Sequence, residues 1–467
     1  GDKIQIGTNV WLQVALDGKI EILANGQIYR LGALRWLHPG SYDDSICPGG
    51  KDADFPHAAM DSNGNAIIVW TQDDGTNWQI FKSEYHNGVW AHPLSLNNNI
   101  SPDVYRAYYP QVAMDDNGNA IIVWLQNFES KWHVFKSEYR NGVWTHPGWI
   151  DEHISPDGQI CYYPRVAMDN NGNALIVWDE KDDANYQIFK SEYRNGTWTH
   201  PASFSDNISP GDHDARFPQV AMDNNGNALI VWEQNNGTNW QIFKSEYRGG
   251  AWTHPALLKD SISPKGEDAH EPQVAMNDNG TAIIVWSQFN GSRKQIFKSE
   301  YRNGTWTHPA SLSDNISPDG QNAEAPQVAV NNSGKAIIVW SQSDGTAVQI
   351  FKSEYGKSGW SHPLSLGNNI SPDGQNASSP QVTMDNPGNI LVIWKQNDGF
   401  NTQLFMSEYR NSTWTHPVSL LDNISPDGLD VEEARAAMDD RGNAVIVWSQ
   451  DNGLKKQIFM SEYRFGF

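Results

Sequence analysis

One tryptophan recurs along this chain at a fixed interval of 54 residues. It closes the phrase IVW or a near variant, and the interval stays constant from the first copy to the last. The eight copies are Trp70, Trp124, Trp178, Trp232, Trp286, Trp340, Trp394 and Trp448. A fixed period of this length predicts a repeat architecture, in which each unit buries its apolar faces against its neighbours.

A second tryptophan series, in the phrase W-x-H-P, is offset from the first. Its members are Trp36, Trp90, Trp144, Trp198, Trp252, Trp306, Trp360 and Trp414. The stretch from Trp36 to Phe467 is 432 residues long, which is 8 × 54. We therefore expect eight full periods that are cut one strand into a unit. The segment around Trp36, His38 and Pro39 is predicted to supply the strand that the last unit lacks.

Each period is expected to contain four strands. In the copy that starts at Pro272 they are strand A near Gln273–Met276, strand B near Ala282–Gln288, strand C near Gln295–Tyr301 and strand D near Thr305–Leu312. No stretch has the i, i+3, i+4, i+7 apolar spacing of a helix. Asn-Gly pairs in the A–B and C–D turns favour tight hairpins. Strand B, AIIVW, is apolar on both faces, as a strand between two other sheets should be.

The predicted fold is all-β: an eight-bladed β-propeller with four-stranded antiparallel blades. Residues 34–467 are assigned to the propeller, and its last blade is closed by the N-terminal strand. Residues 1–33 are expected to form a three-stranded β-meander that caps the channel or adds a sheet at the rim. The alternative is that these strands join the Trp36 strand as a ninth, shortened blade.

Charge and composition exclude several classes of protein. The formal net charge of −22 repels phosphate, so nucleic acid is not expected as a partner. The chain has no run of 18 apolar residues, so insertion into a membrane is not expected. Cys47 and Cys161 precede different blades and are expected to be free thiols. The acidic repeat, rich in Asn, Gly and Trp, favours a bacterial protein that is secreted, periplasmic or on the cell surface. No metal or other cofactor is expected.

The phrases PQVAMDNNGNALIVW and SEYRNGTWTHP resemble the bacterial BNR or sialidase-like repeat propellers. The Asp-box of that superfamily, S-x-D-x-G-x-x-W, is matched here by Ser299, Tyr301, Asn303, Gly304 and Trp306. The serine-to-tryptophan spacing is kept, whereas the aspartate is replaced by tyrosine and the glycine is shifted by one residue. The resemblance covers residues 34–467 and implies a propeller more firmly than it implies an activity.

Sialidases bind the substrate carboxylate with three arginines and use a Tyr–Glu nucleophile pair with an acidic proton donor. The phrase IYRLGAL is similar to the sialidase phrase YRIPAL, although it lacks the proline, and it would place Tyr29 and Arg30 at the first-arginine position. Four further arginines precede or start A strands: Arg106, Arg165, Arg216 and Arg435. We assign no catalytic residue and treat sialidase chemistry as the third hypothesis.

One face of the ring is expected to vary from blade to blade. The B–C loops and the D–A crossovers share this face, and the nearly invariant A–B and C–D turns share the other one. Two positions before the A-strand proline, or before Ala434 in the last blade, stand Asp54, Tyr108, Tyr162, Arg216, His270, Glu324, Ser378 and Glu432. Because strand A is innermost, we expect this series to surround the channel mouth and to bind a ligand.

The B–C loops differ between the two halves of the chain. Blades one to four carry Trp78, Trp132, Tyr186 and Trp240, and the remaining blades carry Lys294, Val348, Thr402 and Lys456. Exposed aromatic rings stack on sugars and also form protein-binding hot spots. The alternative is that these rings pack against the neighbouring crossover.

The sequence thus predicts an exported, lectin-like module that binds a glycan or a small polar ligand through the variable face. A protein-interaction scaffold that docks a partner on the aromatic half of the rim is the alternative, and a sialidase-like glycoside hydrolase comes third. The oligomeric state is left open.

Overall fold

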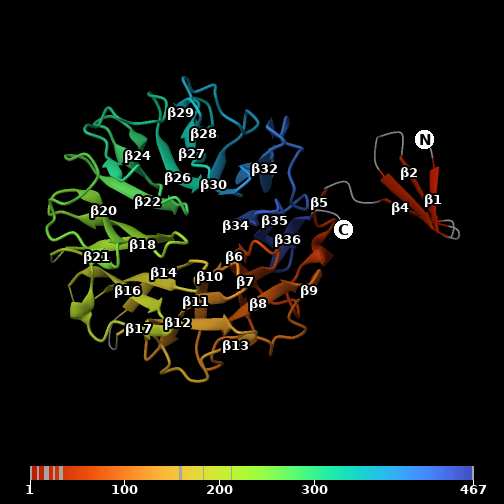
Figure 1. The fold of residues 1–467 in the computed structure, drawn as a ribbon, viewed down its shortest axis with the longest axis horizontal. Coiled ribbons are helices and arrows are strands. Elements are labelled where there is room, and N and C mark those ends of the chain that lie inside the picture. Colours follow the sequence, from red (N-terminus) through yellow and green to blue (C-terminus); the bar gives the residue numbers. More distant parts are fainter. Residues whose placement is uncertain are drawn as a thin grey trace.

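The computed structural model describes residues 3–7, 10–14, 20–24, 27–30, 35–156, 160–181, 184–211 and 213–464. Eight four-stranded sheets are arranged around a central axis, with strand A innermost and strand D at the outer rim (Figure 1). This confirms the eight-bladed propeller. Two 3₁₀ turns, η1 (Tyr42–Asp44) and η2 (Phe204–Asp206), lie in crossovers. No helix in the described residues is long and apolar enough to cross a membrane.

The blades are antiparallel meanders, numbered one to eight along the chain. The A strands are β6 (Ala53–Met60), β10 (Ala107–Met114), β14 (Ile160–Met168), β18 (Ala215–Met222), β22 (Ala269–Met276), β26 (Ala323–Val330), β30 (Ala377–Met384) and β34 (Val431–Met438). The B strands are β7 (Ala66–Asp73), β11 (Ala120–Phe128), β15 (Ala174–Lys181), β19 (Ala228–Asn235), β23 (Ala282–Phe289), β27 (Ala336–Ser343), β31 (Ile390–Asn397) and β35 (Ala444–Asp451).

The outer strands follow the same order. The C strands are β8 (Trp78–His86), β12 (Lys131–Arg140), β16 (Tyr186–Arg194), β20 (Trp240–Arg248), β24 (Lys294–Arg302), β28 (Val348–Gly356), β32 (Thr402–Arg410) and β36 (Lys456–Arg464). The D strands are β9 (Val89–Ala91), β13 (Val143–Thr145), β17 (Thr197–Thr199), β21 (Ala251–Thr253), β25 (Thr305–Thr307), β29 (Gly359–Ser361), β33 (Thr413–Thr415) and β5 (Arg35–Leu37).

Strand D is shorter than its sequence suggests. We expected Thr305–Leu312, but β25 ends at Thr307. The following His308-Pro309 pair leaves the ladder because proline has no N–H to donate. His308 instead forms a 2.8 Å hydrogen bond between its Nδ1 and Ser299 Oγ of the same blade. The C–D turn is as expected, since Asn303 (φ 51°) and Gly304 (φ 82°) adopt the paired positive φ of a type I′ hairpin.

The ring is closed by the N-terminal strand. β36 pairs with β5 in the order β34-β35-β36-β5, and Tyr463 lies opposite Trp36. The indole N–H of Trp36 donates to Glu408 Oε2 of blade seven at 3.2 Å. This confirms that the segment around Trp36 supplies the strand that the last unit lacks. The strand pairs with blade eight and also contacts blade seven.

The core lies between blades, as the two-sided apolar pattern of strand B predicts. Residues of β7 from Ala66 to Gln72 are fully buried, and the equivalent stretch is almost fully buried in every blade. Trp70 stacks on Phe81 with 6.0 Å between ring centroids, a pair that every blade repeats. Leu175 and Val177 of blade three pack in one cluster with Trp232 of blade four. Each blade thus depends on its neighbours for burial.

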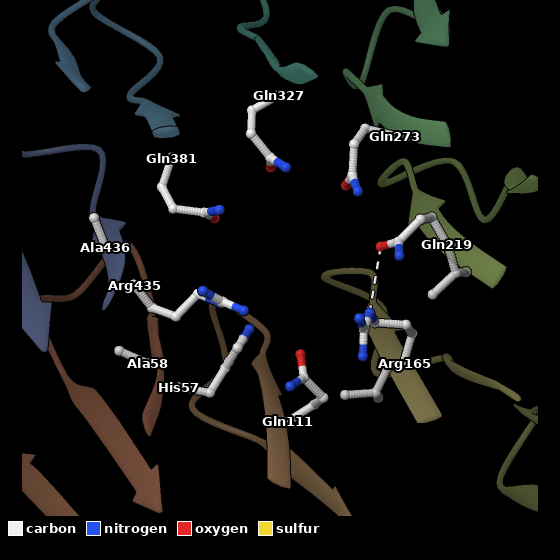
Figure 2. Close-up of a pocket in the computed structure, with 12 residues that line it drawn as sticks. His57, Ala58, Gln111, Arg165, Gln219, Gln273, Gln327, Gln381, Arg435 and Ala436 are labelled. Atoms are coloured by element: carbon white, nitrogen blue, oxygen red, sulfur yellow. Dashed lines mark hydrogen bonds between the residues drawn. The ribbon is translucent and has the colours of Figure 1, made fainter. Parts of the chain in front are cut away.

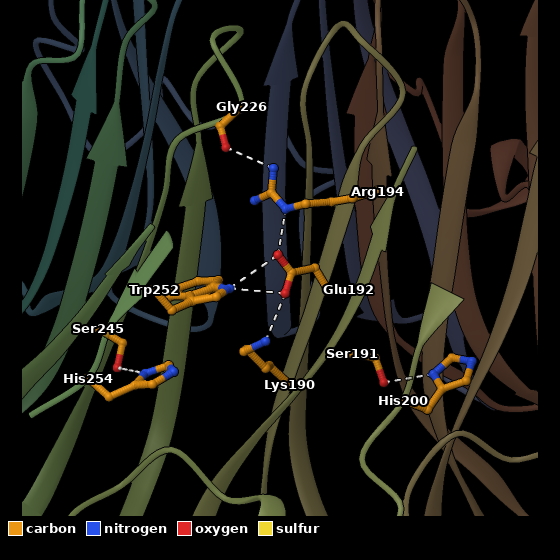
Figure 3. Close-up of polar contacts among 9 residues, drawn as sticks. All are labelled: Lys190, Ser191, Glu192, Arg194, His200, Gly226, Ser245, Trp252 and His254. Carbon is orange, nitrogen blue, oxygen red and sulfur yellow. Dashed lines mark hydrogen bonds and ion pairs between the residues drawn. The ribbon is translucent and has the colours of Figure 1, made fainter. Parts of the chain in front are cut away.

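A polar latch joins each blade to the next near the outer rim. In Figure 3 the carboxylate of Glu192 accepts from Trp252 Nε1 of the next blade at 3.0 Å and pairs with Lys190 and Arg194 of its own strand. Arg194 Nη1 also donates to the carbonyl oxygen of Gly226 at 3.0 Å. All eight interfaces repeat the glutamate–tryptophan bond: Glu84–Trp144, Glu138–Trp198, Glu192–Trp252, Glu246–Trp306, Glu300–Trp360, Glu354–Trp414, Glu408–Trp36 and Glu462–Trp90.

The A–B turns interlock on the invariant face. Asp115 Oδ1 accepts from the backbone N–H groups of Asn117 (3.0 Å) and Asn119 (2.8 Å) in its own turn. Asn117 Nδ2 then donates to the carbonyl oxygen of Asn170 in the next blade at 2.7 Å. The carboxylates of these turns are therefore used to hold the backbone, which explains why this face varies so little.

The N-terminal segment forms a sheet of its own. Its strands are β1 (Lys3–Gly7), β2 (Val10–Val14), β3 (Ile20–Ala24) and β4 (Gln27–Arg30), in the order β1-β2-β3-β4. The expected three-stranded meander is wrong by one strand, because the first hairpin lacks the Asn-Gly or Asp-Gly signal of the other two. Since β5 pairs with β36, these strands do not build a ninth blade with Trp36. A role as a cap or rim sheet stays a prediction.

Candidate functional site

The channel mouth is built where B–C loops meet D–A crossovers. The backbone N–H of Trp240, which starts β20, donates to Asp268 Oδ1 of the following crossover at 2.8 Å. Across the closure, Lys456 N–H donates to Asp52 Oδ1 at 3.0 Å. The two loop sets therefore share one face of the ring.

The predicted mouth residues pair across blade boundaries. Trp78 and Tyr108 lie 5.6 Å apart between ring centroids, and Trp240 and His270 lie 6.0 Å apart. The guanidinium carbon of Arg216 lies 3.8 Å above the ring of Tyr186. The B–C aromatic rings are half-buried by these contacts. They brace neighbouring blades as well as shaping the mouth.

Charged pairs replace aromatic ones on the other half of the mouth. Lys294 Nζ lies 3.8 Å from Glu324 Oε2. Lys456 Nζ lies 2.7 Å from Asp54 Oδ2 and 2.5 Å from Glu432 Oε2, bridging blades eight and one. The mouth therefore has an aromatic half, on blades one to four, and a half without aromatic B–C residues, on blades five to eight. We call the second half the charged half because Lys294, Glu324, Lys456 and Glu432 lie on it.

A second series was missed in the sequence. The residues directly before the A-strand proline, or before Ala434, are Phe55, Tyr109, Tyr163, Phe217, Glu271, Ala325, Ser379 and Glu433. The first seven have φ between 49° and 60°, in the left-handed region, where each A strand bulges between its paired residues. A bulge re-aims its side chain. The signal was available, because this series also switches from aromatic to acidic or small after blade four.

The two series together form an aromatic pocket of about 440 Å³. It is lined by Phe55, Tyr108, Tyr109, Leu125, Trp132, Tyr162 and Tyr163. Phe55 and Tyr109 pack with 4.5 Å between ring centroids, as do Tyr163 and Phe217. Tyr109 remains 46% exposed and Tyr163 41% exposed, so two aromatic surfaces face the solvent within the pocket.

A polar ring, which we call the girdle, lies one residue beyond the A-strand proline. Its members are His57, Gln111, Arg165, Gln219, Gln273, Gln327, Gln381 and Arg435. Figure 2 shows these side chains directed into the channel from all sides. They line a cavity of about 270 Å³. Arg165 Nε donates to Gln219 Oε1 at 3.4 Å, which links two blades across the girdle.

The basic members of the girdle influence one another. Burial, and then the charges of Arg435 and Arg165, lower the pKa of His57 to about 3. Burial, followed by the charge of Arg435, lowers the pKa of Arg165 to about 10. At neutral pH His57 is therefore neutral and Arg165 is charged.

Blade three also buries two acids beneath the mouth. Asp179 lies opposite Tyr162 in the β14–β15 ladder, is fully buried, and neither carboxylate oxygen has a hydrogen-bond partner among the described residues. Burial raises its pKa well above the usual range, against the charges of Arg216 and Arg165. Burial also raises the pKa of Glu180 to about 7, although Glu180 Oε2 accepts from Trp178 Nε1 at 2.9 Å.

The structure places the remaining candidates as follows. Arg165 and Arg435 enter the girdle and Arg216 the mouth, whereas Tyr29 and Arg30 belong to β4, whose side chains lie outside the described part of the chain. Both cysteines are free thiols. Among the described residues no group of three or more His, Cys, Asp or Glu side chains could hold a metal ion.

The fold and the mouth together define the chain as an eight-bladed β-propeller whose channel mouth is aromatic on one half and charged on the other. No family profile matches the sequence, and no curated protein does. Among solved structures the chain is similar to an ulvan lyase of polysaccharide lyase family PL25, at 10% identity and a TM-score of 0.48, over 91% of this chain and 95% of the lyase.

Two further solved structures have lower TM-scores. The GH93 α-L-arabinofuranosidase of Fusarium graminearum, in complex with arabinobiose, has a TM-score of 0.38 at 11% identity, over 92% of this chain and 98% of its own. A protein of unknown function from Dyadobacter fermentans has a TM-score of 0.39 at 12% identity, over 66% and 95%. All three TM-scores lie below 0.5, so they carry no argument about what this chain does.

Proposed function

We propose that this protein is an exported module that binds a glycan at the aromatic half of its channel mouth. The observation that carries the proposal is the pocket in which Tyr109 and Tyr163 expose their rings while each packs against a phenylalanine of a neighbouring blade. The apolar C–H face of a sugar ring stacks on such surfaces, and neighbouring polar groups then select among its hydroxyl groups.

The pocket is preorganised for this task. Its rings are held by ring–ring contacts across blades, so little side-chain freedom is lost when a ligand binds. Arg216, His270 and Glu324 continue the mouth beyond the aromatic pocket and offer donors and acceptors to a longer ligand. A saccharide of several units would thus meet stacking at one end and hydrogen bonds at the other.

A glycan array tests the proposal with variants that the repeat itself supplies. Tyr109→Ala and Tyr163→Ser reproduce the residues that blades six and seven carry at the same bulge, Ala325 and Ser379. Both variants should fold and lose binding at least tenfold, and Trp132→Ala should weaken it as well. Trp149→Ala, which removes an exposed tryptophan outside the pocket, should bind as the wild type does. Wild-type binding to no glycan, or unchanged binding by both tyrosine variants, would overturn the proposal.

A protein-interaction scaffold is the second candidate, because apolar side chains are exposed where strand D ends. Leu94, Leu364 and Val418 directly follow the His-Pro pair in their blades and are at least 90% exposed. Replacing all three with serine should abolish capture of a protein partner and leave glycan binding intact. The sialidase-like hypothesis comes third, and hydrolysis of a fluorogenic sialoside that Arg30→Ala abolishes would revive it.

A further inference from the structure

We propose that the girdle is a binding site for an oxyanion: a carboxylate, sulfate or phosphate group held in the channel by Arg165 and Arg435. The site does not depend on the glycan proposal, because it lies beyond the bulge and shares no lining residue with the aromatic pocket. The ligand of this site would lie inside the channel and not at its mouth.

Charge is the first argument. The girdle contains two arginines, one histidine and five glutamines, and none of its members is an acid, although the whole chain has a formal net charge of −22. Within the part of the chain that the structure describes, no carboxylate oxygen lies within 4.0 Å of the Arg165 guanidinium. Arg435 is partly compensated by Glu433, whose Oε2 lies 3.3 Å from its Nη1. Two cations in one small cavity repel each other, and an anion between them would offset that repulsion.

Hydrogen-bonding capacity is the second argument. Arg165 Nη1 donates to the carbonyl oxygen of Pro164 at 3.0 Å, and Arg435 Nη1 donates to that of Ala434 at 2.8 Å, so each guanidinium is anchored to its own strand. The fork of each arginine has further N–H groups to offer, and arginine forks match the geometry of oxyanions. The amide groups of the five glutamines supply neutral donors around the same cavity (Figure 2).

The size of the cavity limits the ligand. About 270 Å³ accommodates a small ion with its water, or the acidic group of a larger ligand that enters from the mouth. These two sources share one chemistry, and binding experiments can separate them.

The repeat again provides the matched variant. Arg165→Gln combined with Arg435→Gln installs the residue that five blades already carry at this position, so the fold should be retained. Isothermal titration calorimetry at constant ionic strength would use sulfate, phosphate, glucuronate and glucose as probes. We expect the wild type to bind at least one of the three anions and not glucose, and the double variant to lose affinity at least tenfold. Arg293→Gln, which removes an exposed arginine of a B–C turn, is the control and should bind as the wild type does.

The outcomes separate the sources and the two proposals. Binding of sulfate or phosphate alone supports a free ion, and binding of glucuronate alone supports an acidic sugar. Absence of binding for all three anions, or equal binding by the double variant, would overturn the anion site. Tyr109→Ala should leave sulfate binding unchanged, so failure of the glycan proposal remains distinct from failure of this one.

Discussion

Single residues that depart from the repeat can lower the stability of the blade that carries them, and Glu180 is one of them. At the position of Glu180, the seven other blades carry glutamine, whose Nε2 donates to a crossover proline carbonyl. In blade two, for example, Gln126 Nε2 donates to Pro102 at 2.6 Å. An ionised Glu180 has no proton to donate to the equivalent carbonyl of Pro156, and one of its oxygens has no partner among the described residues.

Glu180→Gln should therefore stabilise the protein. With the pKa raised from 4.5 to about 7, folded Glu180 keeps a proton that the unfolded chain releases. The penalty is absent below pH 4.5, grows as the pH rises to 7, and reaches about 3 kcal/mol. Denaturant midpoints should rise in the variant at pH 8 and change little at pH 5. An equal shift at both pH values would contradict this account.

His57 gives the opposite pH dependence. Its Nδ1 lies 3.4 Å from the N–H of Val112 and accepts from it only when unprotonated. Because the folded pKa is about 3 and the ordinary value 6.5, the stability due to neutral His57 is present above pH 6.5 and is lost as the pH falls toward 3. When the pH drops from 7 to 4.5, the free energy of unfolding should fall by about 3 kcal/mol less in His57→Gln than in the wild type. Denaturation of the wild type and the variant at the two pH values would measure this, and an equal loss of stability in both proteins would contradict it.

Much of the mouth could be predicted at this scale, and the rest could not for a physical reason. Counting back two residues from the proline found Tyr108 and Tyr162, which line the pocket. The neighbouring Tyr109 and Tyr163 were missed because regular alternation would turn them away, whereas the bulge re-aims them. The girdle could not be predicted, because its side chains come together across the channel. The 54-residue repeat shows which residues are equivalent but not which of them are in contact.

At the scale of elements, each interface combines apolar burial with the glutamate–tryptophan latch. The two parts have different roles, since the apolar core supplies most of the free energy and the latch fixes how blades dock. Strands B and C could be predicted closely from periodicity. Strand A was predicted too short, because β22 begins at Ala269 and continues through the bulge at Glu271, whereas the expected strand began at Gln273. The end of strand D could not be predicted, because His308 and Pro309 leave the sheet and the His308 side chain forms a hydrogen bond with Ser299 instead.

The latch can be measured by a double-mutant cycle. Glu192→Ala and Trp252→Phe should each lower the free energy of unfolding by about 1–3 kcal/mol, because each leaves partly buried partners unsatisfied. The double variant should lose less than the sum of the two. Urea denaturation of the wild type, the two single variants and the double variant gives the coupling free energy between Glu192 and Trp252. Strict additivity would show that the latch does not hold these blades together.

At the scale of the whole molecule, closure depends on one short strand. β5 covers the edge of blade eight, and the Tyr42 hydroxyl next to it donates to the carbonyl oxygen of Asp427 at 2.7 Å. Deleting residues 1–42 should lower the Tm substantially, because it exposes the apolar cluster that contains Trp36. Deleting residues 1–33 keeps this strand and is the control. If the two truncated proteins had the same Tm, the strand would have no role in closing the ring.

The ring as a whole presents two unlike halves around one axis, and the functional proposal depends on that asymmetry. A crystal structure of the protein soaked with an oligosaccharide that it binds tests this most directly. The account predicts density for a sugar ring stacked on Tyr109 or Tyr163 within the channel mouth. Density confined to the outer rim, or to the charged half of the mouth, would contradict it.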